Sequence, residues 1–93
     1  MNNTNSQPTV HPTNVAVVGL GFMGLTHIKS YQQLPGARIV AVCDAVRLPV
    51  NGVLAGVSGN ITGSDAIDLG KNIRTYQMLE ELLADREVEL VDL

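Results

Sequence analysis

Three glycines in the stretch GLGFMG have the spacing of a turn that binds a dinucleotide. Gly19, Gly21 and Gly24 follow a short apolar run and precede a helical pattern. In such a turn the first glycine permits a sharp bend out of the strand, and the second lets a pyrophosphate approach the backbone. The third lets the helix pack closely on the strand. The helix would direct its free N–H groups and the positive end of its dipole at the phosphates.

An acidic residue closes the next apolar run. Asp44 lies 20 residues after Gly24, where a carboxylate can accept hydrogen bonds from the adenosine ribose hydroxyls. The same charge repels the 2′-phosphate of NADP, so the pattern favours NAD as the cofactor. Arg47 has two interpretations, a ligand for that 2′-phosphate or a solvated loop arginine, and we favour the second.

The elements that must position these residues follow the order strand, turn, helix, strand. Residues 15–18 and 39–43 are continuous apolar runs, which is typical of buried parallel strands. Residues 22–34 between them have helical spacing, and Pro35-Gly36 ends the helix. The unit has the length of a βαβ unit, whose right-handed crossover makes the two strands parallel and adjacent.

The expected helix has one inward stripe, whose members recur at steps of three and four. The stripe consists of Met23, His27, Tyr31 and Leu34, with Ile28 beside it. His27 on this stripe is either a functional histidine near the cofactor or a packed histidine that bonds to backbone. We favour the packed histidine.

The rest of the chain has weaker signals. Apolar spacing at Val50, Val53, Leu54 and Val57, with Pro49 before it, predicts a short helix that Gly52 and Gly56 weaken. A loop is expected over residues 58–72 and a brief strand over 73–76. Met78, Leu79, Leu82 and Leu83 predict an amphipathic helix, with Glu80 and Glu81 outward and Asp85, Arg86 and Glu87 as part of its charged face and exit. Residues 88–93 predict a last strand.

Composition narrows the class of protein. The chain has 93 residues, a formal net charge of -3, no tryptophan and one cysteine, Cys43. The negative charge argues against a nucleic-acid partner, and no apolar run is long enough to span a membrane. We expect Cys43 to be a small buried hydrophobe, Lys29 and Lys71 to be solvated, and the protein to be cytoplasmic.

The sequence therefore predicts an α/β fold, a partial Rossmann-type parallel sheet with strand order 3-2-1-4 and helices on both faces. Residues 14–93 form the N-terminal part of such a domain, and this part ends after the fourth strand. Residues 1–13 form a disordered leader in which His11 is exposed. In such a sheet, residues 88–93 form a free apolar edge, so we also expect self-association.

The stretch VAVVGLGFMGLTHIKSYQQLPGARIVAVCD resembles the opening of the Gfo/Idh/MocA family, the relatives of glucose–fructose oxidoreductase and inositol dehydrogenase. LLADREVELVDL is similar to the next conserved stretch of that family. The resemblance implies the NAD(P)-binding part of an oxidoreductase that moves hydride between nicotinamide and a sugar, polyol or related secondary alcohol. It assigns cofactor contacts to Gly19, Gly21, Gly24 and Asp44, and to the backbone of Leu20, Phe22 and Met23.

The family's Glu-Lys-Pro lysine and its downstream histidine have no counterpart before Leu93, so we assign no catalytic residue. The sequence has no metal-ligand spacing either, so we assign no metal ligand. A non-catalytic nucleotide-binding or interaction module is the main alternative. A methyltransferase is disfavoured because Met23 stands where its third glycine would be. A flavoprotein is disfavoured because its second strand usually ends in Glu.

Overall fold

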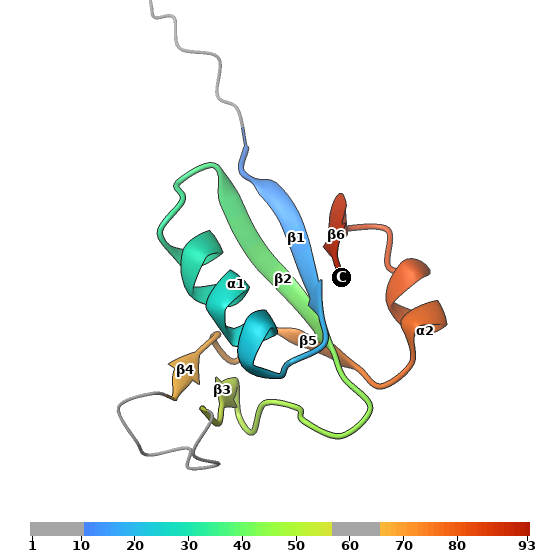
Figure 1. Cartoon of the computed structure of the whole chain (residues 1–93). Coiled ribbons are helices and arrows are strands. Elements are labelled where there is room, and N and C mark those ends of the chain that lie inside the picture. Colours follow the sequence, from blue (N-terminus) through green and yellow to red (C-terminus); the bar gives the residue numbers. More distant parts are fainter. Residues whose placement is uncertain (1–10, 57–65) are drawn as a thin grey trace, which may run out of the picture.

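The computed structural model describes residues 11–56 and 66–93, which form an α/β unit around one parallel sheet. This confirms the predicted α/β class. The sheet has the order β5-β2-β1-β6, so its third, second, first and fourth strands along the chain lie side by side (Figure 1). All three strand pairs are parallel. The strands are β1 (Thr13–Val18), β2 (Ala37–Cys43), β5 (Arg74–Tyr76) and β6 (Leu90–Asp92).

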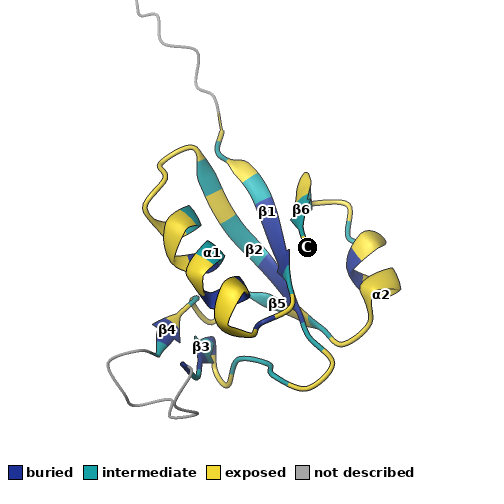
Figure 2. Ribbon diagram, in the orientation of Figure 1, coloured by how far each residue is buried: buried dark blue, intermediate teal, exposed yellow. Residues whose placement is uncertain are grey.

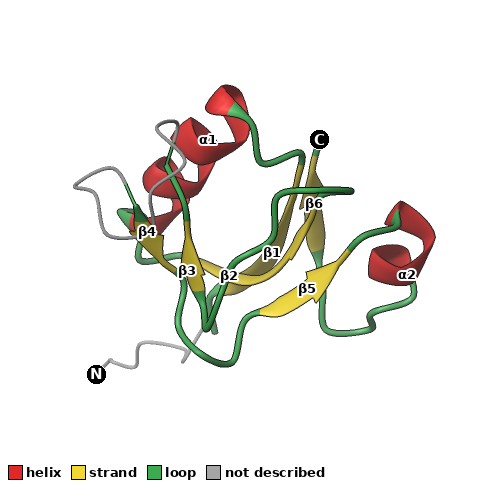
Figure 3. Ribbon diagram, turned by 90° about the horizontal axis from the view of Figure 1, so that it is seen from below, coloured by secondary structure: helices red, strands yellow, loops and turns green. Residues whose placement is uncertain are grey.

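The two helices cover opposite faces of this sheet (Figure 3). Helix α1 (Phe22–Gln32) packs Leu25 and Ile28 against Val15 and Val17, whereas the short helix α2 (Leu79–Leu83) packs Leu82 against Ala16. Successive residues of a strand point to opposite faces, so β1 supplies both cores. Cys43 is buried in the second core, as expected for a small hydrophobe.

The inward stripe predicted for α1 is wrong in part. Gly24, Leu25 and Ile28 are buried, whereas Met23 and Leu34 are more than half exposed (Figure 2). Leu34 lies beyond the end of α1 at Gln32. For Met23 the reason is the close contact of Gly24 with the turn, which fixes the rotation of the helix about its axis. A residue one position away is turned by about 100°, and Met23 therefore faces outward.

The helix predicted around residues 50–57 is a β-hairpin instead. Asn51 and Gly52 both have positive φ, 51° and 83°, and Val50 and Val53 exchange two backbone hydrogen bonds of 2.9 Å. An Asn-Gly pair between apolar residues is a strong signal for such a turn, and it overrides the helical spacing. Strand β3 (Val53–Leu54) then pairs antiparallel with β4 (Ile67–Asp68), within the predicted loop.

The hairpin also completes the core under α1. Leu54 and Ile67 are both buried in the cluster that contains Ile28. A side chain at Gly52 would run into the Gly70 carbonyl, so the hairpin turn packs directly on the segment that leads to β5. Val57 of the predicted helix lies outside the described residues.

The remaining boundaries differ little from those predicted. Strands β5 and β6 and helix α2 are present, although in α2 only Leu82 is buried. Strand β1 begins at Thr13, so the leader predicted for residues 1–13 extends one residue too far. Residues 1–10 of that leader lie outside the described residues. His11 is exposed as expected, and so are Lys29 and Lys71. In residues 11–56 and 66–93, no helix is long and apolar enough to cross a membrane.

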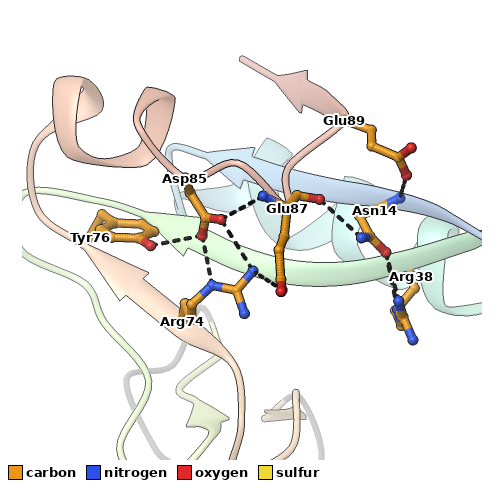
Figure 4. A network of polar contacts seen from close by, with 7 residues as sticks. All are labelled: Asn14, Arg38, Arg74, Tyr76, Asp85, Glu87 and Glu89. Carbon is orange, nitrogen blue, oxygen red and sulfur yellow. Dashed lines mark hydrogen bonds and ion pairs between the residues drawn. The ribbon is translucent and has the colours of Figure 1, made fainter.

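A polar network joins β5 to the segment between α2 and β6 (Figure 4). The Asp85 carboxylate accepts hydrogen bonds from Arg74 Nε at 2.6 Å, from the Tyr76 hydroxyl at 2.8 Å and from the Glu87 N–H at 2.9 Å. The side chain of Asp85 is only 7% exposed. Asp85 is therefore not part of an ordinary solvated face, as its sequence neighbours suggested, but anchors the chain as it leaves α2.

This network predicts that the protein loses stability in acid. The bonds from Arg74 and Tyr76 lower the pKa of Asp85 from 3.8 to about 2. A carboxyl with a depressed folded-state pKa stabilises the fold above pH 3.8, and this contribution is lost as pH falls toward 2. We expect the loss to be on the order of 1–2 kcal/mol. Urea unfolding at about pH 5 and pH 2.5 measures it.

Asp85→Asn is the matched variant for this prediction. It should be less stable than the parent at about pH 5, and the difference should shrink at about pH 2.5. Equal pH dependence in the two proteins would show that Asp85 does not contribute to acid unfolding.

Candidate functional site

The glycine turn is held between the ends of β1 and β2. Gly19 has a φ of +86°, a conformation that favours glycine, and its N–H donates to the Cys43 carbonyl at 2.8 Å. A Cβ atom on Gly24 would collide with the Gly19 carbonyl. The first turn of α1 therefore lies directly on the turn, which is the role that the sequence assigns to the third glycine.

Gly21 is different because the space beside its Cα is open. A Cβ atom there would meet no atom within 4 Å, so packing within the described residues does not require a glycine. Gly21 is the N-cap of α1 and has no side-chain cap, and the first turn of α1 contains no acidic residue. Phe22 and Met23 follow it with exposed side chains. The turn thus presents an uncapped helix N-terminus with room for a group other than a side chain.

Asp44 lies beside this turn, and its carboxylate binds backbone N–H groups from both sides. Oδ2 accepts from Leu20 N at 2.7 Å, and Oδ1 accepts from Val46 N and Arg47 N, both at 2.9 Å. Burial alone would raise the pKa of Asp44, but these hydrogen bonds outweigh it and the pKa is lowered. Asp44 is therefore ionised at neutral pH.

The carboxylate of Asp44 retains capacity for one more donor. A carboxylate offers about four acceptor positions, two on each oxygen, and Oδ1 already receives two hydrogen bonds. The bond from Leu20 occupies one position on Oδ2. The remaining acceptor position is on Oδ2, the oxygen next to the glycine turn. Because Asp44 is only half-buried, a donor from outside the protein can reach this carboxylate.

Arg47 is not the solvated loop arginine that we favoured. Its Nη2 donates to the Ala55 carbonyl at 3.2 Å and to the Gly56 carbonyl at 2.9 Å, and the residue is half-buried. The guanidinium thus holds the two residues that follow β3 close to the loop that follows β2. Sequence spacing gives no signal for this contact, because it depends on the hairpin.

His27 bonds to a side chain rather than to backbone, which corrects the favoured interpretation. Its Nδ1 lies 3.1–3.2 Å from the two carboxylate oxygens of Asp92 in β6, and the Tyr31 hydroxyl donates to Asp92 Oδ2 at 2.8 Å. The hydrogen bond to Asp92 also raises the pKa of Tyr31. Asp92 was missed as a partner, although an acidic residue inside an apolar strand is a signal that a polar group faces it.

The structure therefore places the predicted residues in two separate groups. The glycine turn and Asp44 form one continuous site through the Leu20 bond, and Arg47 joins that site through its backbone N–H. His27 lies one helical turn further along α1 and connects α1 to β6. Within the described part of the chain, no group of three or more metal-ligating side chains is present.

Comparisons with protein family models, with curated proteins and with solved structures found no match for this chain.

Proposed function

We propose that this chain is the cofactor-binding part of an NAD-dependent oxidoreductase related to the Gfo/Idh/MocA family. The observation that carries the proposal is the contrast between two glycines of the turn. Gly24 is a glycine because the backbone of Gly19 leaves no room, but nothing in the described fold fills the space at Gly21. A glycine that packing does not require is expected where a ligand must approach the backbone.

The residues present fit a dinucleotide. The backbone N–H groups of Gly21, Phe22 and Met23, at the start of α1, would bind the pyrophosphate. The open acceptor position of Asp44 would bind a ribose hydroxyl, and its charge would exclude a 2′-phosphate. When bound, the nicotinamide supplies hydride transfer, and the family resemblance suggests a sugar, polyol or related secondary alcohol as substrate.

A non-catalytic nucleotide-binding module is the second candidate. His27 follows the turn in α1 and Asp44 bonds to the turn through Leu20, and each is engaged with protein groups. Neither is therefore an unoccupied acid or base for proton transfer to a substrate. Both candidates predict binding of the dinucleotide, whereas only the oxidoreductase predicts turnover of an alcohol in the protein that contains its catalytic residues.

Calorimetric titration of the chain with NAD and NADP tests the shared prediction. We expect NAD to bind about tenfold more tightly than NADP, a difference of about 1.4 kcal/mol, because Asp44 is ionised and repels the 2′-phosphate. Absence of binding by either dinucleotide would overturn both candidates. Equal affinities would overturn the role of Asp44 in cofactor choice.

We also propose that the chain associates with itself through β6. This strand pairs on one side with β1 and, among the described strands, has no neighbour on its other side. Leu90 of this strand and Leu93 just after it are 42% and 80% exposed. An unpaired apolar edge favours pairing with another chain. We expect sedimentation velocity to show dimers or larger species at protein concentrations of tens of micromolar. Leu90→Lys should reduce the fraction of these species. A stable monomer would contradict this.

A further inference from the structure

A second candidate site lies at the end of the sheet away from the glycine turn. A cleft of about 410 Å³ opens beside residues 38–40 of β2 and the segment 69–74 that leads into β5. The glycine turn bonds instead to Cys43, the last residue of β2. The cleft and the proposed dinucleotide site are therefore at opposite ends of the same strand.

The cleft exists because β5 is short and β2 is irregular. Strand β5 pairs only with residues 41–43 of β2, so the first half of β2 has no neighbour on that side within the described sheet. The register with β1 shifts from Ile39 to Ala41, which leaves Val40 as an extra residue. Val40 and Ala41 both pack in the core on the α2 side, as expected at a β-bulge. Bulges are frequent next to binding sites.

Three cationic residues line this cleft, from separate parts of the chain. Arg38 comes from β2, Lys71 from the turn before β5, and Arg74 from β5 itself (Figure 4 shows the two arginines). Glu87 is the anionic side chain among the lining residues, and it pairs with Arg74 at 3.0 Å. Asp85 also pairs with Arg74. The charge of Arg74 is therefore compensated by protein groups.

Arg38 and Lys71 are not compensated in the same way. Arg38 donates from Nε and Nη2 to the neutral Asn14 side chain, at 3.1 and 2.9 Å. Lys71 is exposed, and neither cation forms an ion pair with a carboxylate in the described residues. The side chains of the lining residues thus carry more donors than acceptors, since an arginine has five N–H donors and a lysine three.

The backbone adds to this excess of donors. Gly70 and Ile73 close a turn through a 3.4 Å hydrogen bond, and Gly70 has a φ of +86°. The N–H groups of Lys71 and Asn72 inside the turn donate to no backbone group among the described residues. Successive free N–H groups in a turn, next to cations, form a concave surface that suits an anion.

We propose that this cleft binds a phosphate group, either as free phosphate or as a monoester. A phosphate has oxygens to accept from Arg38, Lys71 and the turn at the same time, and arginine matches its geometry with two parallel hydrogen bonds. The other wall of the cleft is apolar and includes Leu69 and Ile73. An ester group would lie against that wall.

Amide chemical shifts of the ¹⁵N-labelled chain test this site with inorganic phosphate, against chloride at equal ionic strength. We expect the resonances of Gly70, Lys71 and Asn72 to shift and to saturate at millimolar phosphate. Lys71→Gln should weaken the binding at least about fivefold, and Arg38→Gln should do the same. Lys29→Gln removes an equally exposed lysine from α1, outside the cleft, and should leave the binding unchanged.

The same spectra separate this site from the proposed dinucleotide site. Phosphate at the glycine turn would shift the resonances of residues 19–24 instead. The absence of shifts at one of the two sites therefore does not affect the test of the other site. A second titration with phenyl phosphate identifies the source, because tighter binding than inorganic phosphate assigns an ester and equal or weaker binding assigns free phosphate. Shifts that rise without saturation, or that saturate at the same phosphate concentration in Lys71→Gln as in the parent, would overturn the proposal.

Discussion

Gly24→Ala is expected to unfold the chain or destabilise it by at least about 3 kcal/mol. The added methyl group would overlap the Gly19 carbonyl, which is backbone and is fixed by the hydrogen bond from Gly19 N to Cys43. The collision can be relieved only by moving α1 away from β1, and this would open the core around Leu25 and Ile28. Thermal unfolding followed by circular dichroism measures the effect.

Gly21→Ala is the matched control, because it adds the same methyl group three residues earlier, into open space. We expect it to cost less than about 1 kcal/mol, the penalty of alanine as an N-cap. In contrast, the affinity of this variant for NAD should fall at least about tenfold if the proposed site is correct, because the methyl group would stand in the path proposed for the pyrophosphate. Gly24→Ala as stable as the parent would contradict the packing argument. Unchanged NAD affinity in Gly21→Ala would contradict the proposed site.

Asp44→Ala is expected to affect both stability and binding. It removes the acceptor for three backbone N–H groups, and one of these belongs to Leu20, which is fully buried. An unsatisfied buried donor costs about 1–3 kcal/mol, so we expect a loss of about 2–3 kcal/mol in urea unfolding. Affinity for NAD should fall as well, because the glycine turn loses the bond from Leu20 to Asp44 and is left with the bond from Gly19 to Cys43.

Asp44→Asn separates the charge of Asp44 from its shape. The amide keeps one acceptor oxygen but no negative charge, so its stability should lie between those of the parent and Asp44→Ala. Its preference for NAD over NADP should disappear in calorimetric titrations. A retained preference would show that another group excludes the 2′-phosphate. Because the pKa of Asp44 is lowered in the fold, its contribution to stability is lost only as pH falls through that lowered pKa.

The sequence alone predicts those parts of the protein whose cause is local. Continuous apolar runs predicted β1 and β2, and the glycine spacing predicted the start of α1 at Phe22. The position of Asp44 after β2 was also predicted, because parallel strands place their carboxyl ends at one edge of the sheet. In each case the residues that decide the structure are close in sequence, so a short window contains the whole physical reason.

The hairpin at Asn51-Gly52 shows how two local signals can conflict. Apolar residues at helical spacing favoured a helix, whereas two residues with positive φ require a tight turn. The turn prevails because Leu54 and Ile67 bury their side chains under α1 only when β3 and β4 pair. The contact of Arg47 with Ala55 and Gly56 then follows from the hairpin, and it was therefore missed with it.

The tertiary structure alone decided the pairs that join distant parts of the chain. Asp92 bonds to His27 and Tyr31 more than 60 residues earlier, and the face that α1 turns to the sheet depends on the contact of Gly24 with Gly19. A sequence pattern gives the type and period of an element, but its rotation and its partners depend on which backbones come into contact. The sequence thus indicated the glycine turn and the acidic residue beside it, and only the fold decided which face of α1 packs on the sheet and which distant side chains bond to that helix.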